Sequence, residues 1–179
     1  MKHSLQTAPP PQIPVARNSA PSSYFGPSNF HWLIRGRLGG MSQAGLLRSL
    51  DNDLIGVSSL GVTHVVTLTS EWDAPLAEFS QQGIAGIRLP IDDMQAPDLQ
   101  LACDVCAQVD EILQKGGCLA FHCRAGRGRT GTMLAAQLIY YDFKHIDAIT
   151  SVRDIYKYWI ESDVQMEFLA DFAGMLRKS

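Results

Sequence analysis

The sequence predicts an α/β fold, in which a central and mainly parallel sheet is flanked by helices on both faces. Short runs rich in β-branched and aromatic residues alternate along the chain with longer runs that carry helical spacing. The clearest helical run starts at Asp98, where apolar side chains recur at intervals of three and four residues. Strands that alternate with helices are typical of parallel sheets covered on both sides, and sites in such folds lie beyond the carboxyl ends of the strands.

The first half of the chain holds two predicted strand–helix pairs and a third strand. Aromatic or β-branched content indicates the strands, and apolar positions on one face indicate the helices. Gly61 and Gly83 end the helices, and the glycines between residues 35 and 40 are expected to end the first strand. In order, the expected segments are a strand at 30–34, a helix at 46–60, a strand at 64–68, a helix at 75–82, a strand at 84–89 and a loop at 90–97.

The second half begins with the amphipathic helix that starts at Asp98 and ends at Gly116 and Gly117. A short apolar strand is expected at 118–121. Three further helices follow from their apolar spacing, at 130–141, 146–159 and 163–176.

Two segments of the chain differ in composition and predict one domain preceded by a tail. Residues 1–24 are rich in proline, serine and alanine, so they bury too little apolar surface to offset the entropy of ordering. We therefore expect a flexible, proline-rich tail at 1–24 and a single catalytic domain at 25–179, which is long enough for a sizeable core.

The overall composition narrows the classes of function. Nucleic-acid binding requires a basic surface, but the net charge is −3 and the pI is near 5.9. No apolar run approaches the roughly 20 residues of a membrane span, and the first residues lack the apolar core of a signal peptide. Four cysteines in 179 residues do not predict a disulfide scaffold. We expect a cytoplasmic monomer with free thiols.

The segment from His122 to Thr132 carries the chemistry. A buried strand leads into a glycine-containing loop, and a helix is expected to begin at about Thr130. Glycines let successive N–H groups turn inward to form an anion-binding nest, and the helix dipole adds positive potential at the same point. Three arginines and no acids lie within six residues. The residues predicted to bind a phosphate are Arg124, Ala125, Gly126, Arg127, Gly128 and Arg129.

Cys123 stands at the start of that nest. The field that holds a phosphate also favours the thiolate over the thiol, which makes Cys123 the candidate nucleophile. Arg129, six residues further on, can grip two phosphate oxygens with its planar guanidinium. The alternative from another class is a phosphate-binding module without turnover.

The string His122–Thr130 resembles the His-Cys-x5-Arg-Thr signature of the cysteine-dependent protein tyrosine phosphatases. The short chain is similar to the small, atypical dual-specificity branch, and the resemblance covers roughly residues 25–175. It implies hydrolysis of a phosphomonoester through a phosphocysteine intermediate, with no metal and no cofactor. It also implies that the Thr130 hydroxyl stabilises the departing thiolate and that His122 supports the loop through hydrogen bonds.

The same resemblance implies a general acid on an upstream loop, often followed by a proline four residues later. That spacing selects Asp93, which is matched to Pro97, and leaves Asp92 as the alternative. Gln165 resembles the glutamine that positions the hydrolytic water. A capping box in which Ser162 is the N-cap and Gln165 the third helical residue explains the same string, and both interpretations stay open.

The substrate class also stays open at this point. We favour a phosphoprotein as the substrate, dephosphorylated at tyrosine and at serine or threonine. The loop is also similar to that of the phosphatase-and-tensin-homologue lipid phosphatases, because Arg124 and Arg127 add two cations where those enzymes have lysines. A phosphoinositide is therefore the alternative substrate. A protective disulfide between Cys118 and Cys123 is conceivable, although no spacing argument supports it.

Overall fold

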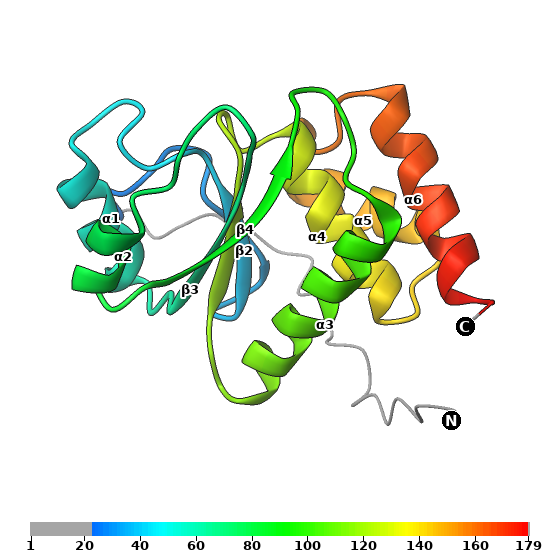
Figure 1. The fold of residues 1–179 in the computed structure, drawn as a ribbon, viewed down its shortest axis with the longest axis horizontal. Coiled ribbons are helices and arrows are strands. Elements are labelled where there is room, and N and C mark those ends of the chain that lie inside the picture. Colours follow the sequence, from blue (N-terminus) through cyan, green and yellow to red (C-terminus); the bar gives the residue numbers. More distant parts are fainter. Residues whose placement is uncertain (1–22, 179) are drawn as a thin grey trace.

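The computed structural model describes residues 23–178, so the predicted tail at 1–24 lies outside the described residues except for Ser23 and Tyr24. Five strands form one sheet in the order β1-β2-β5-β3-β4 (Figure 1). The β2–β5, β5–β3 and β3–β4 pairings are parallel, and only β1 runs antiparallel to its neighbour. The strands are β1 (His31–Ile34), β2 (Leu38–Met41), β3 (His64–Thr69), β4 (Ala85–Ile91) and β5 (Leu119–His122).

Helices cover both faces of the sheet, as predicted (Figure 1). One face carries α1 (Leu50–Ser59) and α2 (Leu76–Gln81), and the other carries α3 (Leu99–Gln114), α4 (Gly128–Tyr140), α5 (His145–Ile155) and α6 (Asp163–Leu176). Each face has its own apolar core. Along β5, Leu119 and Phe121 join the core under α3 to α6, whereas Ala120 joins the core under α1 and α2, as the alternation of side chains along a strand requires.

The predicted strands and helices are present, and their ends differ by a few residues in most cases. The first helix begins at Leu50 instead of residue 46, because the Ser49 hydroxyl caps it by accepting from the Asn52 N–H. The strand expected to end at residue 89 continues through Pro90 to Ile91. A proline is tolerated there because β4 is an edge strand and has no partner on one side.

One strand was not predicted. Of the glycines expected to end the first strand, Gly36 lies in the turn after β1 with a φ of +67°, as predicted, whereas Gly39 and Gly40 lie inside β2, which pairs with β1 on one side and with β5 on the other. A Cβ on Gly40 would lie 2.6 Å from Thr130 Cγ2, so glycine is needed where α4 packs closely on the sheet. The second strand was missed because this close approach was interpreted as part of the turn.

The helix expected at 146–159 ends at Ile155. Residues beyond it form an irregular segment in which Ile160 has a φ of +67°, a value that β-branched residues rarely adopt. Arg153 holds this segment by donating to the carbonyls of Trp159 and Ile160 at 3.2 and 2.7 Å. The apolar spacing persists through Trp159 because that side chain is fully buried, but it is buried outside the helix.

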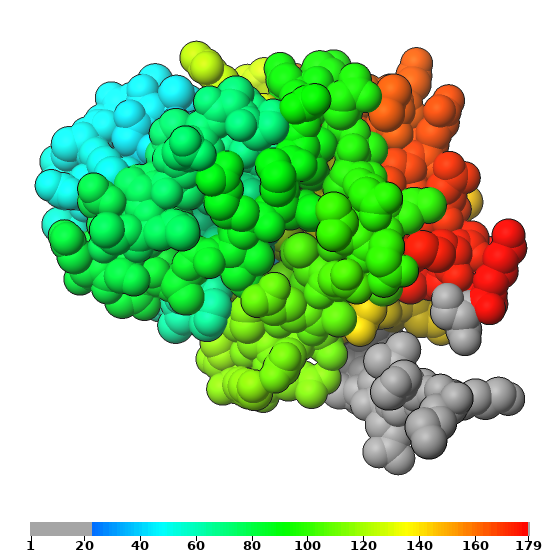
Figure 2. Space-filling model, viewed as in Figure 1, coloured from blue at the N-terminus to red at the C-terminus, as the bar shows by residue number. Residues whose placement is uncertain are grey.

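Because three of the pairings are parallel, the carboxyl ends of β2, β3, β4 and β5 point to one edge of the sheet, at the top of Figure 1. In the space-filling view, atoms of the segments that follow β4 and β5 reach the surface along this upper edge (Figure 2). No helix within residues 23–178 is long and apolar enough to cross a membrane.

Candidate active site

The loop between β5 and α4 forms the base of the site. Its helix begins at Gly128, two residues before the predicted start. Gly126 has a φ of +71°, and a Cβ on it would lie 2.5 Å from the Met41 carbonyl carbon, so only glycine fits where the loop passes the end of β2. Its carbonyl accepts from the buried indole Nε1–H of Trp159 at 3.1 Å. The loop is therefore held from the α5–α6 side as well as from the sheet.

Cys123 lies at the carboxyl end of β5 and is 3% exposed. The Thr130 hydroxyl donates to its Sγ at 3.2 Å, the contact expected for a group that stabilises a thiolate. Cys118 lies before β5 and Cys123 after it. At about 3.3 Å per residue, the strand separates the two thiols by far more than a disulfide allows. Burial also raises the pKa of Cys118 to about 11, and the conceived disulfide is not formed.

His122 is buried beneath the loop. Its Nε2 lies 2.8 Å from the Thr67 hydroxyl, and its Nδ1 lies 3.4 Å from the Cys123 carbonyl oxygen. Because a carbonyl can only accept, Nδ1 carries the proton in the neutral ring and Nε2 accepts from Thr67. Burial lowers the pKa of His122 to about 4. The neutral ring joins β5 to β3, in agreement with a supporting position.

Arg129 is 3% exposed and lies between carboxylates that the sequence keeps far apart. Glu71, just beyond β3, accepts from Nη1 and Nη2 at 2.9 Å each. The hydrogen bond with Arg129 lowers the pKa of Glu71 to about 2. Nη1 also donates to the Ile91 carbonyl at 2.9 Å, and Nη2 lies 3.2 Å from Asp93 Oδ1. This network fixes the plane of the guanidinium.

The two acid candidates lie differently. Asp93 projects into the cavity beside Arg129, and its side chain is 78% exposed. Asp92 does not line that cavity, and its carboxylate accepts from the Ser70 hydroxyl at 2.6 Å. The backbone at this point therefore directs the two adjacent carboxylates to different surroundings.

A cavity of about 240 Å³ opens above Cys123. Its lining consists of Asp93, Met94, Cys123, Arg124, Ala125, Arg127, Gly128, Arg129, Glu161 and Gln165. Of the other predicted site residues, His122, Gly126 and Thr130 are buried. The fold thus brings the predicted nucleophile, phosphate-binding arginine, acid and glutamine to one cavity.

Gln165 both caps α6 and lines the cavity. The capping box is present, with Ser162 Oγ accepting from the Gln165 N–H and the Gln165 side chain bonding the N-cap backbone. Its Oε1 accepts from the Glu161 and Ser162 N–H groups, and its Nε2 donates to the Gln95 carbonyl at 3.2 Å. The two interpretations of Gln165 therefore do not exclude each other, because one Nε2 hydrogen is left for a further acceptor.

The charges at the rim of the cavity are mixed. Arg124 is exposed, whereas the Arg127 guanidinium lies 4.9 Å above the centre of the Tyr158 ring. Glu161 adds a carboxylate, and its Oε2 accepts from the Gly128 N–H at 3.0 Å. An acidic group of the protein thus occupies a donor of the predicted phosphate nest.

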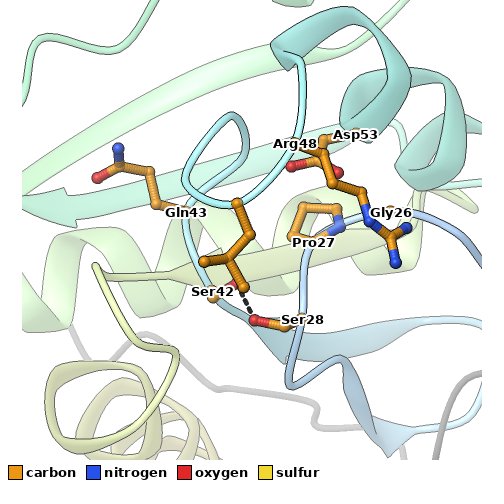
Figure 3. A pocket seen from close by; sticks show the side chains of 8 residues that line it. Gly26, Pro27, Ser28, Ser42, Gln43, Arg48 and Asp53 are labelled. Carbon is orange, nitrogen blue, oxygen red and sulfur yellow. Dashed lines mark hydrogen bonds between the residues drawn. The ribbon is translucent and has the colours of Figure 1, made fainter.

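A second, smaller cavity of about 70 Å³ lies on the α1 side of the sheet (Figure 3). Ser28 and Ser42 hydrogen-bond to each other in its wall at 2.9 Å, and Asp53 lies there with Arg48. The neighbouring Gln43 N–H donates to the Arg124 carbonyl at 3.1 Å. This cavity borders the Gln43 contact with the loop between β5 and α4, and Cys123, the predicted nucleophile, lies in the larger one.

Three residues of the site were missed by sequence reasoning: Glu71, Trp159 and Glu161. Glu71 carried a usable signal, because it follows a predicted strand and the carboxyl ends of parallel strands converge. Trp159 and Glu161 carried none, since the predicted helix placed Trp159 on an apolar stripe and left Glu161 in an unremarkable polar linker.

Comparisons with known proteins agree with this geometry. The family model described as "Polymorphic toxin system, DSP-PTPase phosphatase" matches residues 39–142. Tyrosine-protein phosphatase CDC14 of Saccharomyces cerevisiae is 37% identical over 78 residues, which are 43% of this chain and only 14% of that protein. The Rattus norvegicus "Phosphatidylglycerophosphatase and protein-tyrosine phosphatase 1" is 25% identical over 170 residues, covering 83% of this chain and 86% of that protein. The crystal structure of Tk-PTP in the active form has a TM-score of 0.70 and 25% identity, covering 77% of this chain and 92% of that one.

Proposed function

The chain belongs to the DSP-PTPase phosphatase family, and on that premise we propose that it is a dual-specificity protein phosphatase that acts through a phosphocysteine at Cys123. One observation carries the proposal. The Cys123 thiol and the Arg129 guanidinium, from the segment between β5 and α4, line one cavity of about 240 Å³ together with the Asp93 carboxylate, which follows β4.

The contacts of Arg129 suggest how a phosphate enters. Two of its five N–H groups donate to Glu71, one to the Ile91 carbonyl, and one lies against Asp93. An incoming phosphate replaces Asp93 as the acceptor of the Nη2–H hydrogen bond, and a second phosphate oxygen accepts from the Nε–H. Two oxygens are then bound by one edge of the planar guanidinium. Asp93 is then released toward the oxygen that bridges phosphorus and the leaving group.

The reaction follows in two balanced steps. The Cys123 thiolate attacks phosphorus as the bond to the bridging oxygen breaks, and Asp93, which has taken a proton from solvent on its release from Arg129, gives that proton to the oxygen. Asp93, now a carboxylate, takes a proton from a water that attacks phosphorus, and the Cys123 thiolate leaves with the Thr130 hydroxyl hydrogen-bonded to it. The remaining N–H of Gln165 is the donor we assign to that water. Because the pKa of His122 is about 4, its ring is neutral near pH 7 and takes no proton in either step.

The rim favours a phosphoprotein over a lipid head group that carries several phosphates. Glu161 places a carboxylate at the cavity, and the Arg127 guanidinium lies over Tyr158. A second phosphate on the substrate would therefore meet an acidic group beside the first. Arg124 is exposed and supports the alternative, a phosphoinositide substrate, as does the lipid named for the Rattus norvegicus relative.

The first test is hydrolysis of p-nitrophenyl phosphate in the presence of a chelator. We expect turnover by the wild type and by Cys118→Ser, a matched substitution at a cysteine outside the cavity, and none by Cys123→Ser. Asp93→Ala should slow an aryl phosphate with a poor leaving group about a hundredfold, whereas Asp92→Ala should not. Turnover by Cys123→Ser would refute the phosphocysteine mechanism. Equal loss of rate in Asp93→Ala and Asp92→Ala would refute the assignment of Asp93 as the acid.

The second test compares substrates. Phosphotyrosine and phosphothreonine peptides are assayed beside phosphoinositide in phosphatidylcholine vesicles at equal phosphate concentration. We expect both peptides to be the better substrates. Faster lipid turnover that Arg124→Ala abolishes, with peptide turnover intact, would establish the alternative.

A further inference from the structure

The loop that carries Asp93 has a conformation that its own sequence does not favour. The Gln95 N–H donates to the Asp92 carbonyl at 3.0 Å, which closes a tight turn with Asp93 and Met94 at its centre. Met94 has a φ of +61° and is exposed. Glycine or asparagine is preferred at such a position, so a methionine there needs contacts from outside the turn.

Those contacts come from the start of α6. The Ser162 hydroxyl donates to the Met94 carbonyl at 2.7 Å, and Gln165 Nε2 donates to the Gln95 carbonyl at 3.2 Å. Two consecutive carbonyls of the acid loop are thus bound by two side chains of one helix terminus. The Ser162 hydroxyl is donor and acceptor at once, because it also accepts from the Gln165 N–H at 3.2 Å.

The segment before α6 is itself firmly held. Ile160 is 2% exposed, its left-handed backbone is bound through its carbonyl by Arg153, and the adjacent Trp159 donates to the Gly126 carbonyl of the catalytic loop. The segment 159–162 therefore binds the loop around Cys123 at one end, through Trp159, and the turn that carries Asp93 at the other, through Ser162.

We propose that Ser162 is a positioning residue that latches the acid loop over Cys123, with Gln165 as its second anchor. The proposal rests on the proposed function, in which Asp93 is the general acid. A serine at position 162 is suited to holding the acid loop as well as to capping α6. An aspartate would cap α6 equally well, but it would offer no proton to the Met94 carbonyl.

The test uses two aryl phosphates. The dinitrophenolate leaving group departs without a proton, whereas the phenolate of phenyl phosphate is a poor leaving group and needs a proton from the general acid. We expect Ser162→Ala to lower kcat/KM for phenyl phosphate about tenfold, because misplacing a catalytic group by a fraction of an ångström weakens proton transfer. The comparison uses kcat/KM because it reports the formation of the phosphocysteine, whereas the later hydrolysis is the same for both substrates. The kcat/KM for dinitrophenyl phosphate should stay within about twofold, and Ser162→Thr should restore the value for phenyl phosphate.

Ser49→Ala is the matched control, because Ser49 caps α1 in the same way but contacts no part of the acid loop. It should change neither rate. If Ser162→Ala fails to fold, Ser162→Gly replaces it, since glycine at an N-cap costs only a few tenths of a kcal/mol. Equal slowing of both substrates, or no slowing of either, would overturn the latch.

A double variant separates this proposal from the proposed function. In an Asp93→Asn background, Ser162→Ala should cause no further loss on phenyl phosphate, because the group it positions is gone. Additive losses would overturn the latch while leaving the acid assignment intact. If Asp93→Asn alone slows both substrates equally, the acid assignment fails, and that result is independent of Ser162.

Discussion

The pH dependence of stability offers a quantitative test of the buried histidine in the catalytic loop. Burial lowers the pKa of His122 from 6.5 to about 4, and the nearby Arg129 charge acts in the same direction. Below about pH 6.5 the unfolded chain binds a proton at this histidine while the folded protein does not. The neutral His122 ring therefore does not lower the free energy of unfolding above pH 6.5, and that free energy falls as the pH drops toward 4.

The size of the effect follows from the two pKa values. A shift from 6.5 to about 4 corresponds to about 3 kcal/mol over the whole range, of which about 2 kcal/mol falls between pH 7 and pH 4.5. His122→Asn removes the titrating ring and keeps an N–H donor for the Cys123 carbonyl. Over that interval, we expect the wild type to lose about 2 kcal/mol more unfolding free energy than the variant does.

The assay is urea unfolding of both proteins at intervals between pH 7 and pH 4.5. The difference between the two curves is the informative quantity, because His31 and His64, whose pKa values burial also lowers, are present in both proteins. Any general destabilisation by the substitution shifts one curve without changing its slope. Parallel curves would refute the reasoning, since they would mean that the folded protein protonates His122 as readily as the unfolded chain.

Two further predictions concern carboxylates of the site. Glu71→Gln should lower kcat/KM for p-nitrophenyl phosphate about tenfold, because the amide nitrogen cannot accept one of the two charge-assisted hydrogen bonds that orient Arg129. The control is Asp73→Asn, which breaks the exposed pair with Arg88 and should leave kcat/KM unchanged. Equal effects of the two substitutions would contradict the assignment of Glu71. Glu161→Gln should lower the inhibition constant for inorganic phosphate about threefold at low salt and less at high salt, because it removes a negative charge from the cavity. The control is Glu111→Gln, which breaks a surface pair on α3, and an unchanged constant in Glu161→Gln would show that the carboxylate does not compete with phosphate.

The parts of the site that were predicted are those encoded by neighbouring residues. The cysteine, the arginine six positions later and the glycines between them form one local anion-binding geometry. Asp93 was selected by the spacing to a proline that the family resemblance implies, and its role as the acid stays a prediction. Local spacing also predicted α6, whose bounds match, because capping and apolar periodicity act within one turn. The fold class followed from the alternation of strands and helices, which is likewise a local property repeated along the chain.

The parts that were missed depend on contacts between distant segments. Nothing near Gly40 indicates that α4 packs on it, so the local signal for a turn prevailed over the strand. Glu71 follows a predicted strand and could have been placed at the edge that carries the site, but nothing near it identifies the Arg129 guanidinium, 2.9 Å away, as its partner. Trp159 shows the same limit, because an apolar stripe predicts burial but not whether the residue is buried within a helix or beyond its end.

The distant contacts also change the electrostatic description of the site. By sequence, three arginines stand together without acids, which predicts a strongly positive nest. In the fold, Glu71, Asp93 and Glu161 converge on that nest from three other segments and occupy donors on Arg129 and on the Gly128 N–H. These carboxylates differ in one respect. Glu71 holds the guanidinium through two hydrogen bonds, whereas Asp93 and Glu161 each make a single contact there. A phosphate dianion can therefore displace Asp93 and Glu161 and leave Glu71 in place. In the proposed mechanism, binding is an exchange of the protein's own carboxylates for the substrate, and Asp93, protonated on its release from Arg129, lies where the leaving group needs that proton.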